Sequence, residues 1–170
     1  MTSGITTFTL IHVVISVVGI FAGLVVAGGL VSGKRLDGWT GLFLLTTAAT
    51  SISGFGFPFV KFLPSHAVAI VSLVVLPVVI VARYAKHLAG PWRGIYVVGA
   101  VLALYLNCFV LIAQLFLRVP ALIALAPTGN EPPFAITQLI VLGLFVLLGV
   151  AAVKGFRAAP GATAVAAANL

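Results

Sequence analysis

The sequence predicts an all-α fold, a polytopic integral membrane bundle of five membrane-spanning helices. Three observations predict it: long uncharged stretches, an apolar composition and an uneven distribution of basic residues. The uncharged stretches are 8–33, 40–60, 62–82, 94–117 and 134–153. Each has at least the roughly 20 residues that a helix needs to cross about 30 Å of hydrocarbon. Of the 170 residues, 62% are hydrophobic and 6% are charged, which is too few charges to cover a soluble domain.

The basic residues predict the orientation of this bundle. If the N-terminus is outside, the inner side receives Lys34, Arg35, Arg83, Lys86, Arg93, Lys154 and Arg157, and the outer side receives Lys61 and Arg118. Cytoplasmic loops are enriched in Lys and Arg, so we expect the N-terminus outside and the C-terminus inside, in the cell inner membrane. The net charge of +7 is then a topology signal with affinity for anionic lipid headgroups, and nucleic acid is not an expected partner.

The first two spans contain small and hydroxyl-bearing side chains. The stretch 8–33 is longer than the core of a signal peptide, so we expect it to be retained as the first helix. Its Gly19-x-x-x-Gly23 spacing favours close packing against another helix. The second span has a polar stripe on one face, formed by Thr47, Thr50, Ser51 and Gly54. Such hydroxyls either line a polar path or bond to the backbone of their own helix or to a neighbour.

The other spans have recognisable ends. The third begins with a proline followed by Ser65 as N-cap, and its interior Pro77 should kink the helix. Between the fourth and fifth spans, the apolar segment 121–126 is expected to lie at the membrane interface. Residues 1–157 form a single bundle domain, and the small-residue tail 158–170 is expected to be flexible and cytoplasmic.

Polar side chains gather near the outer ends of the predicted helices. His12 lies about one turn inside the first helix and His66 lies at the start of the third, so both fall within about 6 Å of the outer boundary. The fourth and fifth helices add Asn107, Gln114, Arg118 and Gln138 on the same side. Ionisable and amide groups are costly inside a bilayer and therefore indicate function. The inner half of the bundle is expected to contain almost no polar groups.

Two histidines at matched depth are what a bis-imidazole haem site requires, and the arrangement resembles the general logic of membrane b-type cytochromes. His12 and His66 are the predicted iron ligands of one b-type haem or related tetrapyrrole. Ser16 and Gly19 would leave room for the porphyrin, and Arg118, with Lys61, would pair with its propionates. The pocket would be completed by Asn107, Gln114 and Gln138. Asn107 and Gln114 could bond a quinone carbonyl or a neighbouring helix about equally well.

Other interpretations of the same residues stay open. His12 could simply hydrogen-bond to Ser or Thr of a neighbouring helix, and His66 could be solvated in an interfacial first turn. The pair could also bind copper or zinc, or hold a pigment. The chain could be a cofactor-free accessory or assembly subunit of a larger membrane complex, an oligomer, or a small-solute permease. The sequence contains no nucleophile–base pair, phosphate loop or paired carboxylates, so any enzyme activity would depend on a cofactor. The leading prediction is electron transfer or sensing near the outer face.

Overall fold

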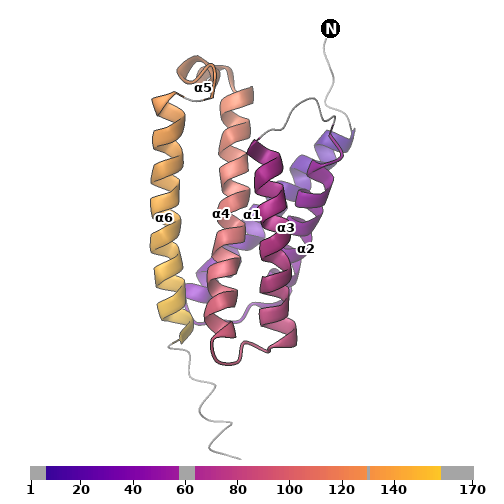
Figure 1. Cartoon of the computed structure of the whole chain (residues 1–170), viewed down its shortest axis with the longest axis vertical. Helices are drawn as coiled ribbons and strands as arrows, with labels where there is room; N and C mark the ends of the chain where they lie inside the picture. The colour runs from indigo at the N-terminus through magenta and orange to yellow at the C-terminus, as the bar shows by residue number, and fades with distance from the viewer. Residues whose placement is uncertain (1–6, 58–63, 130, 158–170) are drawn as a thin grey trace, which may run out of the picture.

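The computed structural model describes residues 7–57, 64–129 and 131–157, and the regular elements among them are all helical. They are α1 (Thr7–Val31), α2 (Asp37–Gly54), α3 (Pro64–Ile80), the π-helical turn η1 (Val81–Ala85), α4 (Trp92–Arg118), α5 (Pro120–Leu125) and α6 (Pro132–Arg157) (Figure 1). Four helices in this part of the chain are long and apolar enough to cross a membrane: α1, the continuous helix His66–Ala85, α4 and α6. The all-α class is confirmed, and the chain has the make-up of a multi-pass membrane protein.

The second expected span, 40–60, differs most from the structure. Helix α2 begins at Asp37 and ends at Gly54, and its 18 residues are less apolar than those of the other long helices. The next three residues, 55–57, are not helical, because Gly56 and the approaching Pro58 disfavour a further helical turn. The total of five spans and the orientation stay predictions.

The third helix widens at its C-terminal end. It begins at Pro64, as expected, and contains Pro77. In η1, which follows, the Lys86 N–H bonds to the Val81 carbonyl at 2.9 Å, a five-residue spacing. This wider turn includes Arg83, which is buried inside the bundle. Three predicted features lie outside the described residues or side chains: the Ser65 cap, the outer-side Lys61 and the tail 158–170.

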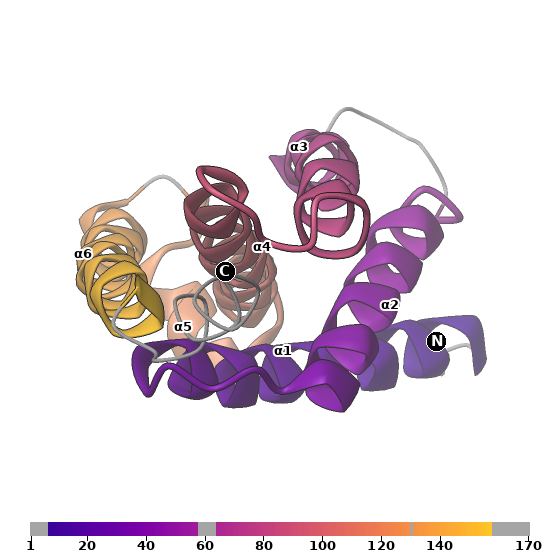
Figure 2. The same cartoon turned by 90° about the horizontal axis from the view of Figure 1, so that it is seen from below.

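Helices α3, α4 and α6 stand side by side, and α1 and α2 are inclined to them. Figure 1 shows α4 between α3 and α6. Figure 2 shows that the N-terminal half of α1 lies beside α2 and that the C-terminal end of α1 lies beside α6. We call the end of the bundle with His12 and His66 the histidine end, and the end with Arg83, Arg93 and Arg157 the arginine end. In the predicted orientation these are the outer and inner ends.

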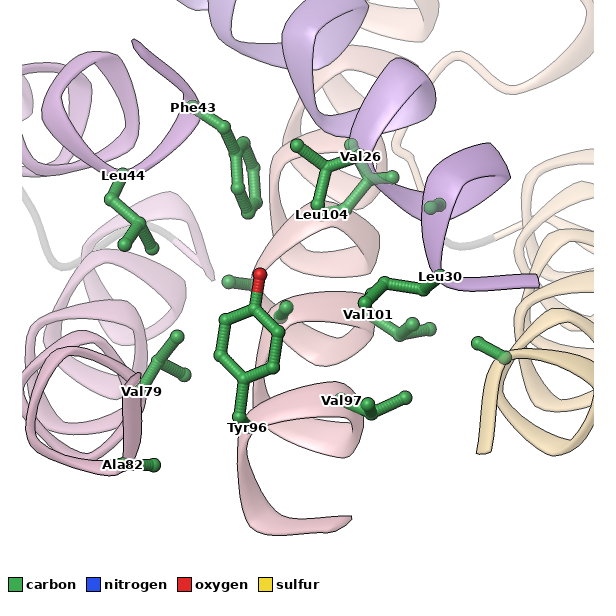
Figure 3. Packing of buried hydrophobic residues seen from close by; sticks show 14 of the residues in the cluster. Val26, Leu30, Phe43, Leu44, Val79, Ala82, Tyr96, Val97, Val101 and Leu104 are labelled. Atoms are coloured by element: carbon green, nitrogen blue, oxygen red, sulfur yellow. The ribbon is translucent and has the colours of Figure 1, made fainter. Parts of the chain in front are cut away.

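The apolar core lies in the half of the bundle at the arginine end (Figure 3). Its buried members come from the second half of α1, the first halves of α2 and α4, the end of α3 with η1, and the end of α6. They include Val26, Leu30, Phe43, Val79, Tyr96, Leu104 and Phe156. In Figure 3, labelled side chains of four helices surround Tyr96, which is 1% exposed. This core therefore fixes the arginine end.

Glycines allow α1 to approach its neighbours closely. A Cβ atom at Gly155 would lie 1.9 Å from the Val31 carbonyl oxygen, so the ends of α6 and α1 touch backbone to backbone. A Cβ atom at Gly23 would lie 2.6 Å from a side-chain carbon of α4, and one at Gly19 would lie 2.9 Å from Thr46 Oγ1. The close packing expected from the Gly19–Gly23 spacing is therefore present.

Candidate functional site

Both predicted haem ligands lie beside the C-terminal end of α2. The His12 Nδ1 atom and the Ser53 hydroxyl oxygen are 2.8 Å apart. The His12 ring packs edge-on against Phe57, with ring centroids 5.0 Å apart. His66 is 6% exposed, and its ring centroid lies 6.1 Å from that of Phe55. Two helices thus bring their imidazoles to one short segment, residues 53–57.

The small-residue face of α1 packs against α2. Ser16 Oγ donates to the His12 carbonyl at 2.7 Å and lies 3.3 Å from Thr50 Oγ1. One turn further along, Gly19 is buried beside Thr46. In this arrangement α2 occupies the space that Ser16 and Gly19 would leave for a porphyrin. The contacts are those of the alternative interpretation, in which polar groups join neighbouring helices.

Two of the predicted pocket amides also join helices. Asn107 Nδ2 donates to Thr47 Oγ1 at 3.0 Å, which links α4 to α2. Gln138 Nε2 donates to the Phe109 carbonyl at 3.1 Å, which links α6 to α4. The Gln138 Oε1 atom is buried and has no hydrogen-bond partner among the described residues. A buried acceptor of this kind is costly unless water or a ligand supplies a donor.

The remaining predicted residues form a surface pair at the histidine end. Gln114 Oε1 accepts a hydrogen bond from Arg118 Nε at 3.0 Å. Residues 7–57, 64–129 and 131–157 contain no group of three or more His, Cys, Asp or Glu side chains that could hold a metal ion. Haem ligation by His12 and His66 stays a prediction.

Hydroxyls of the polar stripe on α2 contact side chains of neighbouring helices. Thr47 Oγ1 accepts the hydrogen bond from Asn107 of α4, and Thr50 Oγ1 lies 3.3 Å from Ser16 Oγ of α1. A hydroxyl engaged in this way has less capacity to bind a passing solute. The polar stripe on α2 therefore fits helix packing better than a transport path.

The arginine end contains a buried polar cluster, so the expectation of an inner half almost free of polar groups is wrong. Arg83 is 4% exposed and bonds to Asp37 through one guanidinium nitrogen. Its Cζ atom lies 5.1 Å from the centroid of the Tyr96 ring. The Tyr96 hydroxyl lies 3.4 Å from Thr40 Oγ1. One chain of polar contacts thus joins η1, α4 and the start of α2.

The chemistry of this cluster explains how a cation is tolerated in the core. A guanidinium stays charged, so its burial requires a counter-charge and further partners. Asp37 supplies the counter-charge from the first turn of α2, where the helix dipole also favours a carboxylate. Its side chain is 81% exposed, so the pair reaches from the core to the surface. Tyr96 supplies an aromatic face for the cation.

One sequence signal pointed to this cluster. Asp37 is the only acidic residue in the segments assigned to the inner side, which contain seven cations, so pairing with one of them could have been predicted. Which cation it meets is decided by η1, which places Arg83 inside the bundle. We find no sequence pattern that predicts this π-helical turn.

Comparison of the chain with protein-family models, curated proteins and solved structures found no match. The protein is therefore classified by its fold alone. It is a small helical bundle with the make-up of a multi-pass membrane protein. Within it, the candidate site is the histidine end, where polar side chains of α1, α2, α4 and α6 lie beyond the apolar core.

Proposed function

We propose that the protein is an accessory subunit of a larger membrane complex and that it receives partner helices at its histidine end. The observation that carries this proposal is the position of the apolar core, which occupies one half of the bundle. Helices α1, α4 and α6 all continue beyond it toward the histidine end. A single chain thus leaves their outer halves with less packing than their inner halves.

The exposed surfaces of these outer halves support lateral contact. Apolar side chains of α1 that are about half exposed there are Leu10, Ile11, Val14 and Val17. On α6 the corresponding residues are Ile136, Leu139 and Ile140. Within a bilayer such faces contact lipid or other helices. The partly exposed polar groups on the same helices indicate which of the two, lipid or another helix, covers these faces.

Amides and hydroxyls at membrane depth favour a protein partner over lipid. Asn107 and Gln114 on α4 are only partly buried, as is Ser16 on α1. Each amide makes one side-chain hydrogen bond within the chain, which leaves further donor and acceptor capacity for a partner. A polar group that faces hydrocarbon is costly, whereas a neighbouring helix can offer it a hydrogen bond. These side chains therefore suit the edge of a helix–helix interface.

Photo-crosslinking in intact membranes tests this proposal. A benzophenone amino acid at Val14 should yield a crosslink to a discrete membrane protein. Val78 on α3 is the matched control, because it is similarly exposed but lies in the half that holds the core. Crosslinks to lipid alone from Val14, or equal protein crosslinks from both positions, would contradict the proposal.

A second candidate function is binding of one b-type haem for electron transfer or sensing. It rests on the position of His12 and His66, which both contact residues 53–57 near one end of the bundle. Because α2 occupies the porphyrin space in this arrangement, haem binding would require α2 to move. To bind iron through Nδ1, His12 would have to give up its contact with Ser53. Arg118 would likewise have to leave Gln114 to pair with a propionate. Asn107, Gln114 and Gln138 would line the pocket.

An absorption spectrum tests the haem candidate directly. Protein purified from haem-sufficient cells should show a Soret band that shifts on reduction and is lost in His12→Ala and in His66→Ala. His87→Ala is the control, since His87 lies in the turn before α4 at the arginine end. A colourless wild-type preparation that takes up no added haem rejects this candidate and leaves the accessory role in place.

A further inference from the structure

We propose that the protein binds an anionic phospholipid at the arginine end, with an acyl chain between α4 and α6 and the phosphate at Arg93, Lys154 and Arg157. The site lies at the opposite end from the proposed partner surface and does not depend on it. Three features carry the inference: an apolar groove, a cluster of cations at its mouth and the lack of an acidic partner for these cations.

The groove between α4 and α6 has a volume of about 500 Å³. This is within the range of about 300–1,000 Å³ typical of small-molecule sites. Its walls are apolar along most of their length and include Val98, Val101 and Tyr105 of α4 with Leu142, Phe145 and Val150 of α6. From Leu142 to Arg157, α6 rises by about 22 Å. That length is sufficient for an acyl chain of one leaflet, since the whole hydrocarbon layer is about 30 Å thick.

Cations surround the end of this groove. Lys154 and Arg157 line it directly. Arg157 also lines a second hollow of about 450 Å³, which it shares with Gly90, Pro91, Arg93 and Gly94. The Arg157 guanidinium lies 4.0 Å from the place where a Cβ atom of Gly94 would be, and Arg93 Cζ lies 5.9 Å from the Phe156 ring centroid. Arg157 thus connects the apolar groove to a cationic hollow.

These three cations have no acidic partner within the described residues. The chain has two acidic side chains, Asp37 and Glu131. Asp37 pairs with Arg83. Glu131 accepts hydrogen bonds from Thr128 just before α6 begins, at the opposite end of the helix from Arg157. Among the described residues no acidic side chain neutralises the cluster, so its charge is available to an anionic ligand.

A phospholipid satisfies both parts of the site at once. Its phosphate matches the guanidinium groups of Arg93 and Arg157, and its chain matches the apolar walls of the groove. The positive end of the α4 dipole lies at the same hollow, because α4 begins at Trp92. In the predicted orientation the site opens to the cytoplasmic leaflet, whose anionic lipids attract basic residues.

Quenching of Trp92 fluorescence by brominated lipids measures this binding. Trp92 is next to Arg93 and becomes the sole tryptophan in a Trp39→Phe background. The protein is reconstituted in phosphatidylcholine vesicles that contain either brominated phosphatidylglycerol or brominated phosphatidylcholine. We expect a preference of about fivefold or more for phosphatidylglycerol, on the scale of about 1 kcal/mol for each cation near the headgroups. Equal quenching by the two lipids would overturn the proposal.

Two pairs of variants test the two parts of the site. Lys154→Gln/Arg157→Gln should abolish most of the preference. Its matched control is Lys34→Gln/Arg35→Gln, which removes two exposed cations from the turn between α1 and α2 and should retain the preference. If both double variants lost the preference for phosphatidylglycerol equally, the lipid would be attracted by the surface charge as a whole, and the proposed site would be overturned. An unchanged circular dichroism spectrum confirms that each variant is folded.

For the acyl chain, Gly149→Leu should fill the groove and weaken quenching by brominated phosphatidylglycerol several-fold. A Cβ atom at Gly149 would lie 3.7 Å from Val101 Cγ1, so the substitution fits the backbone. Gly143→Leu is the control, because no atom lies within 4 Å of the new Cβ position. Soluble glycerol phosphate should not compete with the lipid. If it competes, or if Gly149→Leu binds like the wild type, the cluster is a simple anion site and the lipid proposal fails.

Discussion

The two ends of the bundle are held together by different interactions. At the arginine end, an apolar core, a backbone contact at Gly155 and the buried Arg83 join all the long helices. At the histidine end, single polar contacts such as His12–Ser53 join neighbouring helices in pairs. A closely packed core sums many contacts, whereas a single hydrogen bond between membrane helices contributes about 0.6 kcal/mol on average. We infer that the arginine end supplies most of the stability and that the polar contacts of the histidine end can rearrange at a small cost in free energy.

The largest expected effect is that of Arg83→Ala at the arginine end. It removes the ion pair with Asp37 and the stacking on Tyr96, and it leaves a cavity in a packed region. Together these losses should lower the free energy of unfolding by about 2–4 kcal/mol. Reversible unfolding in mixed detergent and dodecyl sulfate micelles measures it.

Two further variants sharpen this test. Arg83→Lys should fall between Arg83→Ala and the wild type, because lysine keeps the charge but loses the planar stacking. Arg35→Ala, which removes an exposed cation of the neighbouring turn, should change the free energy of unfolding by about 0.5 kcal/mol or less. If Arg83→Ala were as mild as Arg35→Ala, the arginine end would not be the stable end.

A smaller loss is expected from Gly155→Ala. The new methyl group would lie 1.9 Å from the Val31 carbonyl oxygen, so α6 and α1 would have to separate. Overpacking of this kind costs about 1–3 kcal/mol. In Gly143→Ala on the same helix, the methyl group meets no atom within 4 Å, and the thermal midpoint should be unchanged or slightly raised, because alanine favours the helix over glycine. Equal midpoints for the two variants would show that the ends of α1 and α6 are not closely packed in the membrane.

The sequence predicted the helical elements well because each depends on local composition. Uncharged stretches located α1, α3, α4 and α6, and Pro64 marked the start of α3. The end of α2 was predicted too late, since the apolar residues after Gly54 hid the breaking effect of Gly56. Length and hydropathy thus identify the spans but not every boundary.

Side-chain partners depend on helix rotation, which composition does not encode. His12 and His66 were predicted to lie at similar depth. Depth alone does not predict that the His12 ring contacts Ser53. Arg83 was assigned to the inner surface from its charge, although η1 directs it into the core. To predict the ion pair of Arg83 with Asp37, one would have needed the register of the π-helical turn and the distance between α2 and α3.

The smallest expected effect lies at the histidine end, in the pair of His12 and Ser53. A double-mutant cycle with His12→Ala, Ser53→Ala and the double variant isolates their coupling, which should be about 0.6 kcal/mol and no more than about 1.7 kcal/mol. Unfolding in the same mixed micelles as for Arg83 gives the four free energies on one scale. A coupling of several kcal/mol would place a main source of stability at this end too. The histidine end would then be too costly to rearrange, and the proposal that it adapts to a partner would lose its physical basis.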